Sequence, residues 1–421
     1  RGRRRDRRAA LMSPAPWTAD AVLVLGFGGP EGPDEVWPFL ERVTAGRGVP
    51  RERLAVVAEH YLALGGVSPI NAQNRTLAGE LETRLRARGV TALVTLAHRN
   101  SPPYAVDGLS ALAAGGARRV LALATSAFPS YSGCRQYRED LGQGLLDAGL
   151  ADPPEVNAAS ADAELADAPV ADSVLAEASV EVRKIGPFFE LDALVEANVR
   201  AVADGLARLA EQGCTQPIVF FSTHSLPITA AAASGPDDQP DGGPDREDGY
   251  SAAHRLVAAE VIRRIRRGDD TAGPLDWRLV YQSRSGAPSI PWLEPDIVDA
   301  LGDVAATRAT ADPTTPDGVL VVPLGFLTDH VEVRWDLDTQ AGRTAYELGV
   351  PFVRAATIGT DPGFLDALAD LVAHHATGGA HPAPARLAAA QGDRRRCADG
   401  CCANPRSTRP AVAAARTGDL P

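Results

Sequence analysis

The chain has 421 residues, 45% of them hydrophobic and 23% charged, which is enough for two domains of ordinary size with substantial cores. No uncharged apolar run approaches the roughly 18 residues that a membrane-spanning helix requires, so the composition argues against an integral membrane protein. Lys and Arg together number 42 and Asp and Glu 54, and the net charge of −12 argues against a general nucleic-acid binder.

The first residues are unusual: six of the first eight are arginine, and the chain does not begin with methionine. A transit peptide or a polybasic arm is one interpretation, because such segments are rich in arginine and poor in acids. Upstream sequence translated in frame, with Met12 as the natural start, is the other. We favour the second, because no apolar or amphipathic stretch follows the arginines, and we expect residues 1–19 to be disordered or non-native.

Short apolar runs of strand length recur along the chain, with helical patterns between most of them. The predicted strands are residues 21–25, 92–96, 120–124, 218–221, 278–281 and 319–322. The predicted helices include residues 74–88, 104–114, 191–212 and 252–267. Apolar strands that alternate with helices are typical of parallel sheets covered on both faces. With strands in two groups of three, the pattern predicts an α/β fold of two Rossmann-like, doubly wound lobes; one larger sheet is the alternative.

Three segments lie outside this pattern. Residues 151–179 have no strong apolar period and predict a solvated insertion in an N-terminal lobe of residues 20–185. Residues 234–249 form an acidic Gly/Pro-rich loop within a C-terminal lobe of residues 186–375. The tail, residues 376–421, is rich in Ala, Pro and Arg but contains three of the five cysteines. The odd number of cysteines and the lack of a recognisable secretory signal favour a reducing, cytoplasmic compartment over a disulfide scaffold.

In open α/β sheets the ligand site lies outside the carboxyl ends of the strands. Polar, titratable and aromatic residues concentrate after the predicted strands, at residues 26–31, 98–100, 126–134, 222–227, 282–285 and 325–332. The first of these segments, Gly-Phe-Gly-Gly-Pro-Glu, does not fit a dinucleotide-binding loop, because it lacks the last glycine of G-x-G-x-x-G and Glu31 would face a pyrophosphate. The strand ends therefore predict a site, although this pattern alone does not name its chemistry.

Five segments resemble the ferrochelatase family and occur in that family's order. They are residues 24–31 (Val-Leu-Gly-Phe-Gly-Gly-Pro-Glu), 61–69 (Tyr-Leu-Ala-Leu-Gly-Gly-Val-Ser-Pro), 222–227 (Ser-Thr-His-Ser-Leu-Pro), 281–283 (Tyr-Gln-Ser) and 323–332 (Pro-Leu-Gly-Phe-Leu-Thr-Asp-His-Val-Glu). The resemblance implies two Rossmann-like lobes with a porphyrin cleft between them, and insertion of Fe²⁺ into the porphyrin. Cys134 and the tail cysteines resemble the actinobacterial branch, which implies coproporphyrin III as substrate, coproheme as product and a [2Fe–2S] cluster.

The reaction suits the residue types that the resemblance places at the site. Metallation of a free-base porphyrin removes the pyrrole N–H protons, and a neutral imidazole can accept a proton or hold a divalent ion; the resemblance gives His224 this role. It gives Glu332 as the acidic partner. A helix that starts near Asp329 would place Glu332, Asp336 and Gln340 on one face, as oxygen ligands suited to transient passage of Fe²⁺. Gln340 departs from the glutamate of many relatives, and the sequence leaves open whether His224 or Glu332 meets the metal.

The resemblance also implies contacts with the macrocycle. Phe27 stands where some bacterial relatives have a tyrosine near the metal, and its ring can stack on the porphyrin but cannot coordinate iron. Propionates need hydroxyl or cationic partners, and the candidates are Ser68, Tyr131 and Arg47. Trp292 is either a wall of the cleft or an ordinary packed aromatic.

Three tail cysteines, Cys397, Cys401 and Cys402, lie within six residues, a spacing that suits a metal better than a disulfide framework. A [2Fe–2S] cluster and zinc both take four thiolates, so one more ligand is needed. The match to the family loop gives Cys134 as that ligand, whereas Cys214 is expected to be an ordinary buried thiol. Unligated cysteines are the alternative. A cluster here would attach the tail to the N-terminal lobe, in a structural or sensing role rather than in electron transfer.

Other functions stay open at this point. An enzyme of the same fold could act on protoporphyrin IX, or insert cobalt or nickel into another tetrapyrrole. A non-catalytic haem or iron carrier would use the same cleft, but the pairing of His224 with an acidic face favours the enzyme. Besides coproporphyrin III and Fe²⁺, we expect transient contact with coproheme decarboxylase, no nucleic-acid partner, and a monomer in the cytoplasm.

Overall fold

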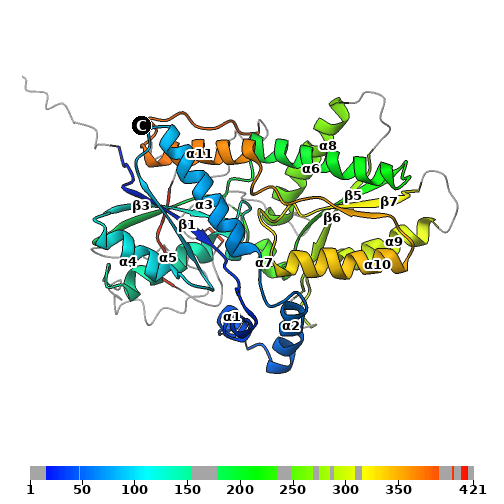
Figure 1. The fold of residues 1–421 in the computed structure, drawn as a ribbon, viewed down its shortest axis with the longest axis horizontal. Coiled ribbons are helices and arrows are strands. Elements are labelled where there is room, and N and C mark those ends of the chain that lie inside the picture. Colours follow the sequence, from blue (N-terminus) through cyan, green and yellow to red (C-terminus); the bar gives the residue numbers. More distant parts are fainter. Residues whose placement is uncertain are drawn as a thin grey trace, which may run out of the picture.

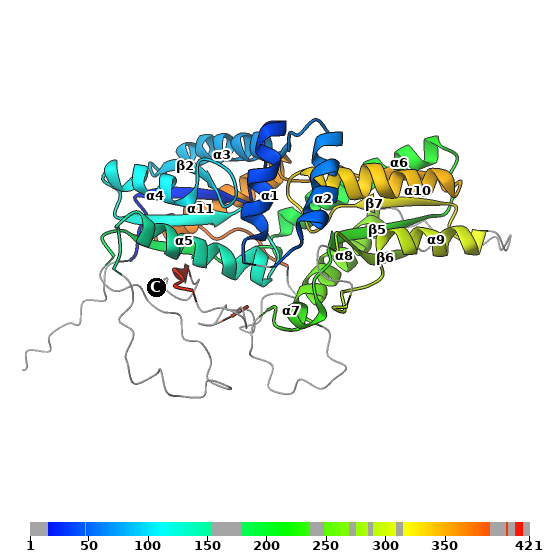
Figure 2. The same cartoon turned by 90° about the horizontal axis from the view of Figure 1, so that it is seen from below.

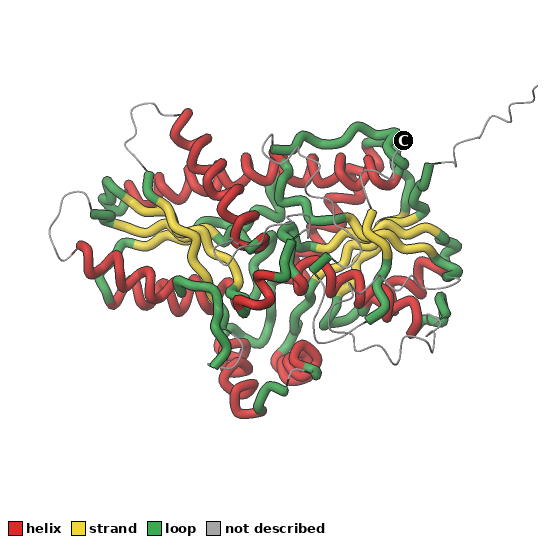
Figure 3. The backbone as a smooth tube through the Cα atoms, turned by 180° about the vertical axis from the view of Figure 1, so that it is seen from behind, coloured by secondary structure: helices red, strands yellow, loops and turns green. Residues whose placement is uncertain are grey.

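Two parallel sheets lie side by side in the molecule, with helices on both faces of each (Figures 1 and 3). The computed structural model describes residues 16–46, 48–152, 178–235, 248–268, 275–284, 289–308, 315–387, 401–402 and 409–415. The predicted α/β fold of two doubly wound lobes is confirmed, and the alternative of one larger sheet is wrong.

The N-terminal sheet has the strand order β2-β1-β3-β4-β9, and each neighbouring pair is parallel. Its strands are β1 (Ala21–Gly26), β2 (Leu93–His98), β3 (Arg119–Ala124), β4 (Glu181–Ile185) and β9 (Ala413–Ala415). Its helices are α3 (Ile70–Ala87) on one face and α4 (Ala105–Ala114) and α5 (Gln136–Asp147) on the other. Strand β1 lies between β2 and β3 and is buried along its whole length. Because both of its faces are covered by protein, its sequence is a continuous apolar run.

The C-terminal sheet has the order β6-β5-β7-β8, again all parallel. Its strands are β5 (Pro217–His224), β6 (Trp277–Gln282), β7 (Gly318–Val322) and β8 (Phe352–Arg354). On one face lie α6 (Asp192–Glu211) and α8 (Gly249–Gly268); on the other lie α9 (Ile297–Arg308), a π-helix (Val333–Ala341) and α10 (Gly342–Glu347). A short helix, α7 (Ile228–Ala232), follows the end of β5.

Two helices project from the body where the two sheets meet, α1 (Val36–Thr44) and α2 (Arg51–Ala63) (Figure 1); Figure 2 shows them in front of the junction. A short 3₁₀ turn, Pro33–Glu35, leads into α1. Apolar side chains of the two helices, including Phe39 and Tyr61, pack in one cluster with Val331 from the loop after β7. The N-terminal helix pair therefore contacts the C-terminal lobe at that loop.

The two lobes also share a core. Helix α11 (Pro362–Ala376) packs against α3 of the first lobe and α6 of the second. One cluster of buried apolar residues runs from Val22 and Leu123 in the first sheet through Leu368 to Val219 in the second. Because this core is continuous, the strand ends of the two sheets are held at a set position relative to each other.

The tail returns to the N-terminal lobe. Strand β9 extends the sheet beside β4, with Ala414 opposite Lys184. Arg138 on α5 donates from Nε to the Val412 carbonyl at 2.7 Å, and the Val412 amide donates to the Arg138 carbonyl at 3.1 Å. Backbone pairing thus connects the end of the tail to the first sheet.

Some sequence predictions fall outside the described residues. They concern residues 1–15, Arg47, residues 153–177 of the predicted insertion, residues 236–247 of the acidic loop, and Cys397. Within the part of the chain that is described, no helix combines the length and apolar character needed to cross a membrane.

Candidate functional site

The carboxyl ends of the C-terminal strands bring titratable side chains together. His224 is the last residue of β5, and its Nε2 lies 4.0 Å from Oε2 of Glu332, which follows β7. The other ring nitrogen, Nδ1, hydrogen-bonds with the carbonyl of Ser225. Because a carbonyl only accepts hydrogen bonds, Nδ1 carries the proton in the neutral ring, which leaves the Nε2 lone pair on the Glu332 side. The predicted pair is therefore brought together, with the reactive nitrogen facing the carboxylate.

A second histidine belongs to this group, and our sequence reasoning did not select it. His330 Nδ1 also lies 4.0 Å from Glu332 Oε2, and Phe326 packs edge-on against the imidazole with the ring centres 4.9 Å apart. Burial lowers the pKa of His330; the Glu332 charge opposes this effect and the neighbouring His224 adds to it. The ring is thus kept neutral and able to accept a proton. The sequence feature that could have identified His330 is its position two residues before Glu332.

Asp336 lies one turn beyond Glu332 and is held by residues at the end of β6. Gln282 Nε2 is 3.4 Å from both the Glu332 carbonyl and Asp336 Oδ2, and the Ser283 hydroxyl donates to the same Asp336 oxygen. Ser283 has φ of +62°, a left-handed conformation that is costly for a residue with a side chain. Ser222 donates to Gln282 Oε1 at 2.6 Å and so fixes which end of the amide faces the acids.

The environment of Asp336 favours its protonated form. Burial raises the pKa of Asp336 to about 7; the hydrogen bond from Ser283 opposes the rise, and the charge of Glu332 adds to it. A carboxyl group with such a pKa can take up and release a proton near neutral pH.

The acidic residues lie on a π-helix rather than on the regular helix assumed from the sequence. Glu332 caps the π-helix Val333–Ala341, and Asp336 lies within its first turns. Gln282 contacts the backbone carbonyl of Glu332 and the side chain of Asp336, whereas Gln340 is exposed. Such helices are rare and are found frequently at functional sites.

Two buried residues of α8 form hydrogen bonds that fix the end of β5 at His224. The Tyr250 hydroxyl donates to the His224 carbonyl at 3.0 Å and contacts Thr223 Oγ1 at 2.6 Å. His254 Nε2 contacts the same Thr223 hydroxyl at 3.0 Å, and burial lowers the pKa of His254 to about 3. His254 is therefore a neutral structural histidine. Neither α8 residue was predicted from the sequence.

On the N-terminal side the loop after β1 brings an aromatic ring to the junction. Phe27 packs with Phe39 and Tyr61 in the cluster that contains Val331. Gly28 has φ of +81°, and a Cβ there would lie 2.5 Å from the Ser101 hydroxyl, so only glycine fits this turn. Burial raises the pKa of Tyr61 well above its ordinary value, and the charges of two nearby carboxylates, those of Glu332 and Asp336, add to the rise. The Phe27 loop thus lies beside the acidic π-helix.

The remaining candidates for porphyrin contact are spread over both lobes. Ser68 is buried behind the glycine loop, where its amide donates to the Pro30 carbonyl at 2.8 Å. Tyr131 is half-buried, and its hydroxyl donates to Glu139 at 2.9 Å. Trp292 is half-buried and paired with Pro227, just beyond His224.

The described cysteines are all buried. Lys184, the only lysine of the chain, donates from Nζ to Cys134 Sγ at 3.5 Å. Cys401 and Cys402 have their sulfurs 3.6 Å apart and contact the backbone of Gly235. Burial raises the pKa of Cys214, and Asp317 adds to the rise. In the described residues, no three His, Cys, Asp or Glu side chains converge closely enough to hold a metal ion.

Comparison with known protein families supports a functional site at this position. The model of the family described as ferrochelatase matches residues 19–160 and 157–376. The chain belongs to the ferrochelatase family, whose members are enzymes that insert metal into a porphyrin.

Curated relatives resemble the chain over nearly its full length. A coproporphyrin III ferrochelatase of Leifsonia xyli is 40% identical, over 94% of this chain and 95% of the relative. The protein of that name from Streptomyces coelicolor is 42% identical over 94% of this chain and 96% of its own, and that from Nocardia farcinica is 41% identical over 94% and 99%. These relatives match both lobes, so the likeness is not confined to one motif.

Proposed function

We propose that this chain inserts Fe²⁺ into coproporphyrin III and releases coproheme. The observation that carries the proposal is the position of Glu332 Oε2, 4.0 Å from both His224 Nε2 and His330 Nδ1. Bonds from a divalent metal to nitrogen or oxygen are about 2.1 Å long, so Glu332 Oε2 and one of these two nitrogens, 4.0 Å apart, can contact one ion placed between them. The names of the curated relatives support coproporphyrin III as the substrate.

In this proposal the residues divide the reaction between protons and iron. His224 Nε2 accepts a pyrrole proton, since its Nδ1 already donates to a carbonyl. Glu332 and Asp336 pass Fe²⁺ toward the porphyrin nitrogens with oxygen ligands that bind weakly enough to release it. The porphyrin gives up two pyrrole protons, the first to His224 Nε2 and the second to water, and takes Fe²⁺ without a redox step. Phe27, Ser68, Tyr131, Arg47 and Trp292 are the proposed contacts with the macrocycle.

We also propose that Cys134, Cys397, Cys401 and Cys402 bind a [2Fe–2S] cluster. Two thiolates bonded at about 2.3 Å to one tetrahedral metal lie roughly 3.8 Å apart, and the 3.6 Å between the Cys401 and Cys402 sulfurs fits that spacing. Lys184 supports the assignment of Cys134, because a buried ammonium favours a thiolate beside it. When bound, the cluster would link the tail to the N-terminal lobe; zinc in the same four thiolates is the alternative.

The decisive test is anaerobic incubation of the purified protein with Fe²⁺ and coproporphyrin III, followed by absorption spectra. We expect the free-base bands to be replaced by those of coproheme, faster than with protoporphyrin IX. A carrier would instead bind added coproheme tightly and leave the free base unmetallated. The same proposal includes a monomer and transient contact with coproheme decarboxylase, which sedimentation with and without that enzyme would check.

A further inference from the structure

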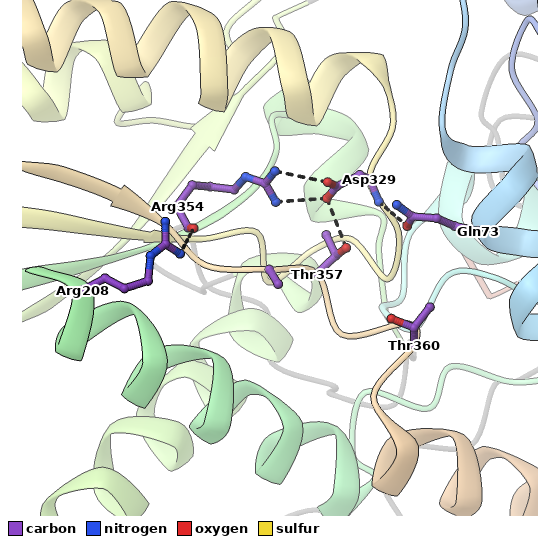
Figure 4. A pocket seen from close by; sticks show the side chains of 7 residues that line it. Gln73, Arg208, Asp329, Arg354, Thr357 and Thr360 are labelled. Atoms are coloured by element: carbon purple, nitrogen blue, oxygen red, sulfur yellow. Dashed lines mark hydrogen bonds and ion pairs between the residues drawn. The ribbon is translucent and has the colours of Figure 1, made fainter.

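Behind the proposed iron donors, one aspartate holds the start of their loop. Asp329 accepts two parallel hydrogen bonds from Arg354, Nη1 to Oδ1 and Nη2 to Oδ2, each 3.1 Å long (Figure 4). Thr357 Oγ1 donates to Asp329 Oδ1 at 3.1 Å, and the Asp329 amide donates to Gln73 Oε1 at 2.8 Å. Gln73 lies on α3 of the N-terminal lobe, so these bonds fix the loop against both lobes.

The same guanidinium binds a second aspartate, further along the chain. Arg354 Nε donates to Asp338 Oδ1 at 2.6 Å, and its Nη2 donates to Asp338 Oδ2 at 3.0 Å. Asp338 lies within the π-helix, two residues after Asp336. Arg354 thus contacts the chain just before His330 and again just after Asp336, on either side of the donors.

Arg354 is itself well anchored. It is the last residue of β8, pairs with Val321 of β7, and its carbonyl accepts a hydrogen bond from Arg208 on α6 at 3.3 Å. The planar guanidinium of Arg354 presents its N–H donors in a fixed arrangement that matches two carboxylates. A lysine ammonium cannot reproduce this arrangement. A pocket of about 460 Å³ lies alongside, lined by residues that include Gln73, Arg208 and Asp329 (Figure 4). Arg354 and Asp329 bond to each other on its wall, so we assign this pair a structural task rather than ligand binding.

We propose that Arg354 is a positioning residue for metal insertion: by holding Asp329 and Asp338 together, it sets the spacing of His330, Glu332 and Asp336 opposite His224. This inference rests on the proposed function, because that function assigns Glu332 and Asp336 to the path of Fe²⁺. The physical reason is that the hydrogen bonds of Arg354 hold the chain segment that carries these side chains, and loss of groups that orient metal ligands commonly costs about 10- to 100-fold in metal affinity or activity.

The test compares Arg354→Gln and Arg354→Lys with a control on the adjoining helix. Arg343→Gln removes an exposed ion pair with Glu347 on α10 and should leave metallation unchanged. We expect Arg354→Gln to lower kcat/KM for Fe²⁺ about 10- to 100-fold and to alter the ratio of Fe²⁺ to Zn²⁺ insertion, with the Kd for coproporphyrin III within about two-fold of wild type. Arg354→Lys should not restore activity, because lysine keeps the positive charge but lacks the planar set of N–H donors that binds both aspartates.

The outcomes separate this inference from the proposed function. Wild-type protein that metallates no porphyrin would overturn the proposed function. Active wild type together with a folded Arg354→Gln of unchanged kcat/KM and unchanged metal ratio would overturn this inference alone. If Arg354→Gln does not fold, Asp338→Asn breaks one of the two contacts: a changed metal ratio in that variant supports the positioning role, and an unchanged ratio refutes it.

Discussion

The two lobes share one architecture, yet their strand ends present different chemistry. Strand β2 in the first lobe ends in His98, and β5 in the second ends in His224. His98 is 1% exposed and lies beneath the glycine loop, whereas the His224 side chain is 27% exposed and faces Glu332. Burial lowers the pKa of His98, which keeps it neutral inside the lobe. A histidine at the end of a parallel strand is therefore buried or accessible according to what the neighbouring loop places against it.

The same contrast extends to the surrounding residues. The first lobe contributes glycines, hydroxyl groups and the Phe27 ring, which we propose as contacts for the macrocycle. The second contributes His330, Glu332 and Asp336, to which we assign the handling of protons and metal. We infer that the first lobe supplies most of the contacts with the macrocycle, together with Trp292 of the second, and that the second lobe metallates it; the following experiments test this division.

The largest effect is expected in the second lobe. His224→Ala and Glu332→Gln should each lower the rate of coproporphyrin III metallation by about 10²- to 10⁴-fold, because general acid–base groups commonly contribute that much. Binding of the porphyrin, measured by fluorescence, should change little. His98→Gln is the matched variant in the first lobe and should lower Tm while its folded fraction stays active. A comparable loss of activity in folded His98→Gln would contradict the assignment of metallation to the second lobe.

The next effect concerns the thiols of the first lobe and the tail. Anaerobically purified wild type should contain about two irons and two sulfides per chain. Cys134→Ser should abolish the colour and lower Tm, because it removes the link that the cluster adds to the pairing of β9 with β4. Cys214→Ser is the matched buried thiol and should keep both iron and colour. Colourless wild type with one zinc would retain the link but exclude the iron–sulfur assignment, and bleaching by Cys214→Ser alone would mean that Cys134 is not the fourth ligand.

A smaller effect should separate binding from chemistry in the first lobe. Phe27→Ala should weaken coproporphyrin III binding about ten-fold, since an aromatic contact contributes roughly 0.5–1.5 kcal/mol beyond its buried area. The rate at saturating porphyrin should stay near that of wild type. Tyr346→Ala, an aromatic that is 86% exposed on α10, controls for loss of a ring. A fall in the saturated rate with unchanged Kd would place Phe27 among the groups that act on the metal.

The smallest effect is on stability and depends on pH. Because burial raises the pKa of Asp336 to about 7, the folded state binds this proton more tightly than the unfolded chain does. The free energy of unfolding therefore falls as pH rises through the interval between the unfolded pKa and about 7. An asparagine at position 336 does not ionise, so the variant keeps its stability over this interval. The Tm of Asp336→Asn minus the Tm of wild type should therefore rise by roughly 2–4 °C between about pH 5 and about pH 8. Asp303→Asn on exposed α9 should show no such trend; a constant difference for Asp336→Asn would mean that Asp336 is charged throughout.

The sequence by itself determined the two-lobed fold, and its motifs selected His224 and Glu332, which the structure brings within 4.0 Å of each other. Five of the six predicted strands are largely buried, and they are apolar runs because their own side chains form the core. The sixth, residues 92–96, overlaps β2 at the edge of its sheet, where Leu93 is exposed. Strands β4, β8 and β9 escaped prediction: β4 contains three charged residues, β8 has only three residues, and β9 is Ala-Ala-Ala. Each is a strand because a neighbouring strand pairs with it. His224 and Glu332 were available from ordered motifs.

Other features of the site were decided only by the tertiary structure. The approach of His224 to Glu332 and the contacts of Arg354 with Asp329 and Asp338 join segments that lie apart in the chain. Local propensity carries no information on such distances. Burial likewise made His98 structural and left His224 accessible, because the dielectric and the partners around an imidazole, rather than its place at a strand end, set its protonation and its role.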